Sequence, residues 1–135
     1  MAFVIANIEL FAAFAVVAAL LGLSYSLESM LGYQVTLPGD AVRLLNDGAN
    51  VIDLRPAGEF AAGHVRGAVN VAPAGVVDWA GKQRKSKLRA VLLVAAPRQS
   101  VFGLSRHLKA QGFEPVCVLK GGMRGWTEAQ LPLVK

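Results

Sequence analysis

The sequence predicts an α/β fold, a parallel sheet flanked by helices, preceded by one transmembrane helix at the N-terminus. Three observations support this fold class. Short apolar runs alternate with stretches of helical spacing, which is the pattern of a parallel sheet covered on both faces. Residues 1–27 carry a single charged side chain, Glu9, and all fourteen Lys and Arg residues lie from Arg43 onward. The length of 135 residues suits one domain with an appendage.

The N-terminal apolar run indicates a membrane anchor. Residues 10–23, LFAAFAVVAALLGL, contain no polar side chain, and an extension to Phe3 or to Leu27 approaches the roughly 20 residues that cross a bilayer. A cleaved signal peptide normally has a basic start, and a buried core helix normally keeps one polar face; this run has neither. We therefore expect a transmembrane anchor in residues 1–30, a linker in residues 31–36 and the domain in residues 37–135, with the lipid bilayer as a partner.

The distribution of charge and cysteine predicts where the domain lies. No Lys or Arg precedes the apolar run and all of them follow it, which favours a C-terminal domain in the cytoplasm. The single cysteine, Cys117, forms no intrachain disulfide, which fits a reducing compartment. We expect a single-pass protein of a bacterial inner membrane with its domain on the cytoplasmic side.

Residues 91–112 are the segment in which we expect the functional site. The apolar run Val91–Ala95 indicates a buried strand, and the spacing of Val101, Leu104 and Leu108 indicates a helix that Gly112 ends. Backbone N–H groups converge in a loop that precedes a helix, and the helix dipole adds positive potential, so such a loop can hold an anion. The candidate residues of this small-anion site are Ala96, Arg98, Gln99 and Ser100.

The other elements follow from the same patterns. The expected helices cover residues 37–46, 56–60, 73–80 and 120–126, and the expected strands cover residues 50–54, 68–71 and 114–119. Because ligands of such sheets bind at the carboxyl ends of the strands, the loop after Ala95 is again the expected site.

Two long segments resemble signatures of the rhodanese-like domain, and the resemblance covers nearly all of residues 37–135. The first is VIDLRPAGEFAAGHVRGAVNV and the second is AQGFEPVCVLKGGMRGW. The matching residues of the first are Asp53, Arg55, Glu59, Phe60, Gly63, His64, Gly67, Ala68 and Asn70. Those of the second are Gly112, Phe113, Val118, Leu119, Gly121, Gly122, Met123 and Trp126.

The resemblance implies a sulfur-carrying cysteine at about Ala95, but no cysteine lies between Val91 and Phe102, and Pro97 removes one amide from the loop. We therefore expect a catalytically inactive binding or regulatory module. The alternative is a sulfurtransferase or sulfur carrier that uses Cys117, whose apolar neighbours favour a buried and inert thiol.

Other polar residues favour structural roles. His64 has no second His or paired Cys at ligand spacing, so we expect its ring to bind a nearby carboxylate or carbonyl and predict no metal site and no cofactor. Asp53 and Arg55 are expected to tie a strand end to neighbouring loops. His107 is expected at the surface.

A basic run follows the third expected helix. Its members are Lys82, Arg84, Lys85, Lys87 and Arg89. A solvated loop is one interpretation; attraction to anionic headgroups, at about 1 kcal/mol per basic residue, is the other. Nucleic acid is not expected, since no aromatic residues or binding motif accompany the run. Small residues of the anchor, Ala12, Ala15, Ala19 and Gly22, would allow another inner-membrane protein to approach closely.

Overall fold

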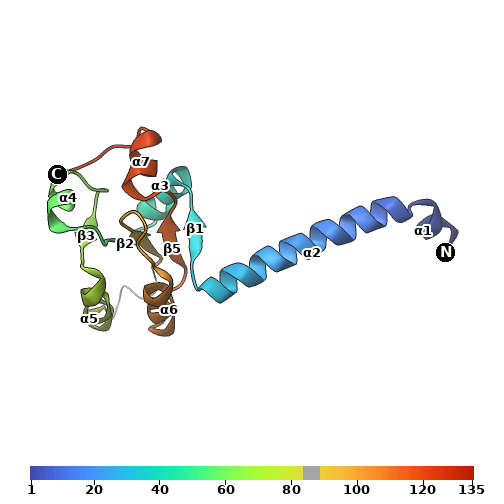
Figure 1. Cartoon of the computed structure of the whole chain (residues 1–135), viewed down its shortest axis with the longest axis horizontal. Helices are drawn as coiled ribbons and strands as arrows, with labels where there is room; N and C mark the ends of the chain where they lie inside the picture. Colours follow the sequence, from blue (N-terminus) through green and yellow to red (C-terminus); the bar gives the residue numbers. More distant parts are fainter. Residues whose placement is uncertain (84–88) are drawn as a thin grey trace. The chain divides into compact units, whose positions relative to one another are not determined.

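The computed structural model describes residues 1–83 and 89–135, and these form two compact units, Met1–Met30 and Leu31–Lys135. The first unit contains the short helix α1 (Ala2–Ala6) and most of the long helix α2 (Ile8–Leu31) (Figure 1). With 24 residues, a mean hydropathy of 2.1 and no buried residue in its most apolar window, α2 is long and apolar enough to cross a membrane. It is therefore a candidate membrane span.

The second unit is built on a five-stranded parallel sheet, and the sequence predicts four of its strands. Its strands are β1 (Gln34–Thr36), β2 (Asn50–Asp53), β3 (Ala68–Asn70), β4 (Val91–Val94) and β5 (Val116–Leu119). Their spatial order is β1-β5-β4-β2-β3, and every neighbouring pair is parallel. All four residues of β4 are buried, because this strand lies in the middle of the sheet and is covered on both faces.

Helices cover both faces of this sheet (Figure 1). They are α3 (Pro38–Asn46), α4 (Ala57–Ala62), the 3-10 turn η1 (Pro73–Gly75), α5 (Val76–Lys82), α6 (Phe102–Ala110) and α7 (Gly122–Glu128). Successive strand residues point to opposite faces, so Ile52 and Leu93 pack with α5 and α6, whereas Val51 and Leu92 pack with α3 and α7. The α/β fold class is confirmed.

The structure corrects the linker that the sequence predicts over residues 31–36. Gln34–Thr36 forms β1, whose register pairs Gln34 with Cys117 and Thr36 with Leu119 of β5. Three residues are too few to show an alternating pattern, and the partner strand lies far along the chain, so the local sequence gives little sign of this strand. The domain therefore begins before Leu37.

Candidate functional site

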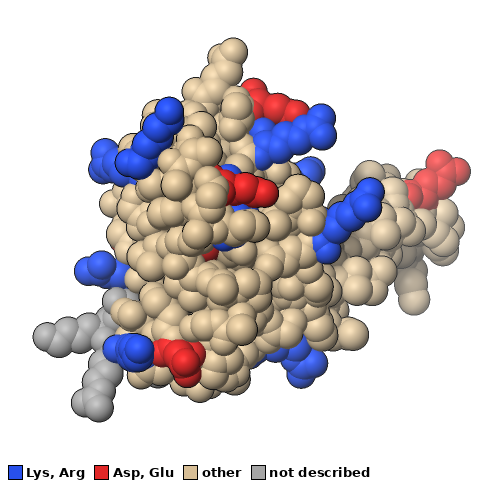
Figure 2. Space-filling model, turned by 60° about the vertical axis from the view of Figure 1, so that its left-hand side comes forward, with Lys and Arg blue, Asp and Glu red and all other residues tan. Residues whose placement is uncertain are grey.

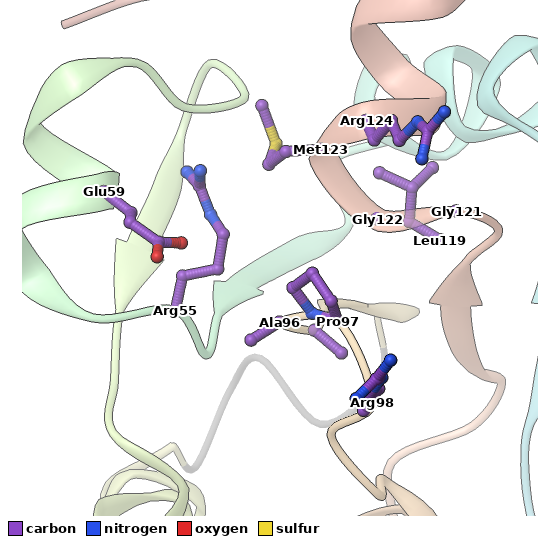
Figure 3. Close-up of a pocket in the computed structure, with 11 residues that line it drawn as sticks. Arg55, Glu59, Ala96, Pro97, Arg98, Leu119, Gly121, Gly122, Met123 and Arg124 are labelled. Atoms are coloured by element: carbon purple, nitrogen blue, oxygen red, sulfur yellow. The ribbon is translucent and has the colours of Figure 1, made fainter.

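A cavity of about 520 Å³ opens where β4 and β5 end (Figure 3). Its walls come from the segments that follow the carboxyl ends of β2, β4 and β5, which are neighbours in the sheet. The lining residues are Arg55, Glu59, Ala95, Ala96, Pro97, Arg98, Leu119, Gly121, Gly122, Met123 and Arg124. The cavity thus lies at the end of the sheet where parallel α/β folds bind ligands.

Ala95 lines this cavity directly after β4, at the position where the family resemblance places a nucleophile. Its methyl group has no nucleophilic atom. Its carbonyl is approached closely by α7, since a Cβ added to Gly122 would lie 2.8 Å from the Ala95 oxygen. Gly122 also has a φ of +54°, which disfavours a side chain. The start of α7 therefore fits against the loop only with glycine at position 122.

The loop after Ala95 satisfies part of its own hydrogen bonding. The Ala96 N–H donates to Oε1 of Gln99 at 3.0 Å, and the Gln99 N–H donates to the Ala96 carbonyl at 3.1 Å. Arg98 has a φ of +61°, and Pro97 has no N–H. The loop consequently offers fewer free amides than the sequence leads us to expect.

Of the residues predicted for the anion site, three are placed at cavities and one is not. The main cavity is lined by Ala96 and Arg98. A second cavity of about 420 Å³ is lined by Ala96 and Gln99, together with Asn70 and Pro73. Ser100 lines neither cavity and is exposed. Anion binding by this loop stays a prediction.

Replacing Gln99 with alanine is expected to strengthen sulfate binding about fivefold, because the freed Ala96 amide can donate one hydrogen bond worth about 1 kcal/mol. Titration calorimetry with sulfate would measure the change. Gln111→Ala, which removes the same side chain from an exposed site, serves as the control. Equal sulfate affinities of the two variants would contradict the prediction.

Arg55 faces the cavity, but its charge is already compensated by Asp53. Its Nε lies 3.0 and 3.1 Å from the two carboxylate oxygens of Asp53, and its Nη2 donates to Oδ2 at 2.8 Å. The same Nη2 donates to the Gly63 carbonyl at 2.8 Å. The Asp53 side chain is fully buried. The pair therefore ties the end of β2 to the loop at Gly63, which confirms its predicted structural role.

His64 also has the predicted structural role. Its Nδ1 lies 2.9 Å from the Phe60 carbonyl, which can only accept, so this nitrogen carries the proton. Its ring stacks on Phe60 at a centroid distance of 3.8 Å, and its backbone pairs with Val134. His107, which we expected at the surface, is instead half-buried with a buried Nε2.

The charges left around the cavity are those of Glu59, Arg98 and Arg124. Figure 3 shows Glu59 beside Arg55 on one side and Arg98 and Arg124 toward the other. Arg124 pairs with Glu128 at 2.9 Å, but both side chains are exposed, at 88% and 66%, so the pair is weak. Two guanidinium groups therefore remain available on one side of the cavity and one carboxylate on the other.

Glu59, Met123 and Arg124 are cavity residues that the sequence analysis did not identify as functional. For Met123 and Arg124 the signal was present in the segment KGGMRGW, which follows β5 directly, whereas Glu59 lies in α4. Because β5 neighbours β4 in a parallel sheet, the segments after both strands must meet at one end. The neighbour relation of the strands, which the sequence does not show, was the missing step.

Cys117 lies in β5 and is not among the residues that line the cavity. It is buried in the core with Leu92 and Trp126. Burial raises the pKa of the Cys117 thiol above its ordinary value of 9.0, and a hydrogen bond with the Thr36 side chain offsets part of this rise. A buried and protonated thiol is a poor nucleophile.

The unchanged protein is expected to lose stability as the pH rises above about 9, because of the Cys117 thiol. A Cys117→Val variant should not show this loss. Because the folded thiol has the raised pKa, its contribution to stability is complete below the unfolded pKa and is lost as the pH rises through the folded pKa. The slope in this window is at most about 1.4 kcal/mol per pH unit.

Urea denaturation of both proteins with a reducing agent, at about pH 7 and about pH 10, would measure this difference below and above the pKa of the unfolded thiol. A near-isosteric valine keeps the packing, so the comparison isolates the thiol. Parallel pH profiles of the two proteins would contradict the prediction.

The basic run is only partly described. Lys82 and Arg89 are exposed, and Arg84, Lys85 and Lys87 lie outside the described residues. Figure 2 shows Lys and Arg side chains spread around the edge of one face, with acidic side chains among them. Within residues 1–83 and 89–135, His, Cys, Asp and Glu form no group of three or more that could hold a metal ion.

Comparison with known protein families and curated proteins gives consistent results. The family model of the Rhodanese-like domain matches residues 37–129. The chain is 35% identical over 104 residues to the uncharacterised protein YibN of Escherichia coli (strain K12), covering 76% of this chain and 73% of YibN. It is 34% identical over 90 residues to the thiosulfate sulfurtransferase GlpE of Pseudomonas fluorescens, covering 66% of this chain and 80% of GlpE.

Solved structures share the fold of the second unit. The Rhodanese_3-like domain of an Anabaena sp. protein matches with a TM-score of 0.57 and 25% identity, covering 65% of this chain and all of that one. The polysulfide-sulfur transferase of Wolinella succinogenes matches with a TM-score of 0.63 and 19% identity, covering 82% of this chain and 88% of that one. The second likeness shows the fold alone.

Proposed function

Because this chain belongs to the rhodanese-like domain family, we propose that it is a non-catalytic binding or regulatory module, which α2 tethers to the cytoplasmic face of a bacterial inner membrane. The observation that carries the proposal is alanine at position 95. This residue lines the cavity after β4, where the family resemblance places the cysteine that carries sulfur. Sulfur transfer of that kind needs a thiolate at this place.

The scaffold around the cavity supports a binding role. The Asp53–Arg55 pair and the stacked His64 hold the end of β2 and its loop, as the family signature implies. The cavity remains open to ligands, whereas the single thiol of the sequence is buried in β5.

The membrane tether is supported by length and charge. A helix of 24 residues spans about 36 Å, more than the roughly 30 Å of a bilayer core. The absence of Lys and Arg before α2, with all of them after it, favours the cytoplasmic side for the domain. The proposal includes attraction of the basic run from Lys82 to Arg89 to anionic lipid headgroups.

Exposure of the full-length protein to thiosulfate would test the lack of catalysis. We expect no persulfide on Cys117 by mass spectrometry and no transfer of sulfur to cyanide, because the thiol is buried and protonated. The alternative function is a sulfurtransferase or sulfur carrier that uses this residue. Turnover that Cys117→Ala abolishes would establish it and overturn the proposal.

Extraction of bacterial membranes with alkaline carbonate would test the tether separately. An integral membrane protein stays in the pellet, so release into the supernatant would exclude α2 as a span. Reporter fusions at the C-terminus would test the orientation, and activity of a periplasmic reporter would reverse it. Crosslinking in native membranes would then show whether another inner-membrane protein is a partner.

A further inference from the structure

We propose that the cavity at the carboxyl ends of β4 and β5 binds an aliphatic monocarboxylate, with its charged head against Arg98 and Arg124 and its apolar body over Ala95, Leu119 and Met123. This inference rests on the proposed binding function of the same cavity and names its ligand class. Three properties of the cavity carry it: its size, its apolar lining and the placement of its uncompensated charges.

The size of the cavity favours an organic ligand. Sites for organic molecules typically enclose about 300–1,000 Å³, and the cavity of about 520 Å³ lies within that range. An inorganic oxyanion fills only a small part of such a volume. The loop also offers little to an inorganic ion, because the amides of Ala96 and Gln99 are both engaged within the loop.

The lining of the cavity favours an apolar ligand body. Ala95, Pro97, Leu119 and Met123 supply apolar surface between the charged side chains. Methionine is unbranched and polarizable, so Met123 can adapt to ligands of different shape. An aliphatic chain in this space removes apolar area from water on both partners, and this gain grows with each methylene group.

The charges around the cavity indicate where the carboxylate of the ligand binds and that the ligand carries only one carboxylate. Arg55 is held by Asp53, whereas Arg98 has no ion-pair partner among the described residues, and Arg124 has only its exposed pair with Glu128. Guanidinium groups bind carboxylates through two parallel hydrogen bonds. Glu59 lies toward the opposite side and would repel a second carboxylate. The cavity therefore favours one carboxylate on one side.

Calorimetry on the full-length protein in lipid nanodiscs tests this assignment, with empty nanodiscs as the blank. The titrants are acetate, butyrate, hexanoate and octanoate, with hexanol as the uncharged analogue, adipate as the dicarboxylate and sulfate as the inorganic anion. We expect affinity to rise along the acid series by up to about fourfold per methylene. Hexanoate should bind more tightly than hexanol, adipate or sulfate.

The chain length at which the affinity of the acids stops rising indicates the source of the ligand. A plateau at hexanoate indicates a short soluble acid, and a further rise at octanoate indicates an acid derived from lipid. Both outcomes support the assignment, because each requires a charged head and an apolar body in the same cavity.

Substitutions locate the binding in the cavity. Arg98→Ala and Arg124→Ala should each weaken hexanoate binding about tenfold or more, which corresponds to one hydrogen bond to a charged group. Arg66→Ala makes the same change in net charge at an exposed residue outside the cavity lining and should leave the affinity unchanged. Glu59→Gln should reduce the difference in affinity between hexanoate and adipate, because the repulsion of the second carboxylate is removed.

Several results would overturn the assignment. These are equal affinity for acetate and hexanoate, sulfate binding as tight as hexanoate binding, no heat with any acid, or the same loss of affinity in Arg66→Ala as in Arg98→Ala. The proposed function fails by a different result, a persulfide on Cys117 after treatment with thiosulfate. Absence of carboxylate binding without a persulfide therefore overturns only the ligand class.

Discussion

Replacing Asp53 with alanine is expected to destabilise the domain by about 3–5 kcal/mol, the typical result of removing one partner of a buried ion pair. The Asp53 side chain is fully buried and the Arg55 side chain nearly so. The Arg55 guanidinium donates to both carboxylate oxygens of Asp53 and also to the Gly63 carbonyl. Without the carboxylate, the Arg55 guanidinium stays in a weakly polar site without a counter-charge. Urea denaturation followed by tryptophan fluorescence would measure the loss.

Two further variants separate the ion pair from general effects of substitution. Asp47→Ala removes an exposed carboxylate and should change stability by no more than about 0.5 kcal/mol. The double variant Asp53→Ala with Arg55→Leu should be more stable than Asp53→Ala alone, because no unpaired charge remains. If Asp53→Ala lowers the free energy of unfolding by less than about 1 kcal/mol, the Asp53–Arg55 pair does not stabilise the end of β2 as described.

Replacing Ala95 with cysteine is expected to create a reactive thiol where the unchanged protein has none. The new side chain would stand at a half-buried position that lines the same cavity as Arg98, whose positive charge favours the thiolate. Each unit by which its pKa lies below that of Cys117 raises the thiolate fraction at neutral pH about tenfold. Made together with Cys117→Val, this substitution leaves a single thiol for alkylation and for thiosulfate.

Mass spectrometry of the native protein would show rapid alkylation of this variant and a slowly formed persulfide. Slow formation is expected because Pro97 and Gln99 leave few loop amides to bind thiosulfate. Ala95→Ser, which has a side chain of similar size without sulfur, is the control. A thiol at position 95 that alkylates no faster than Cys117 would contradict the position of Ala95 on the cavity wall.

The sequence predicts much of this fold because its central strands are continuous apolar runs and its two signatures are long. The runs VLLV and VCVL become β4 and β5, and the residues of the first signature, Asp53, Arg55 and His64, have the structural contacts expected of them. Local pattern suffices for these features, since burial on both faces leaves a strong hydrophobic signal.

The parts that the sequence did not predict depend on contacts between distant or irregular segments. Arg124 reaches the cavity only because β5 neighbours β4, and sequence order does not state that relation. The hydrogen bond from Ala96 to Gln99 occurs in a loop where Arg98 has the left-handed conformation, which non-glycine residues adopt rarely. Composition and periodicity carry no sign of either arrangement.

Because β1 belongs to the sheet, the smallest complete domain includes residues that precede the family match. The family match begins at residue 37, but β1 precedes it, and only Gly32 and Tyr33 separate this strand from α2 along the chain. A chain shortened to residues 37–135 would keep both signatures and the pairing of β5 with β4, but it would lose β1, the outer neighbour of β5. The bared backbone N–H and C=O groups of β5 would then be a template for strand pairing between molecules, and such a fragment would tend to aggregate. A soluble version of this protein should therefore begin at Leu31.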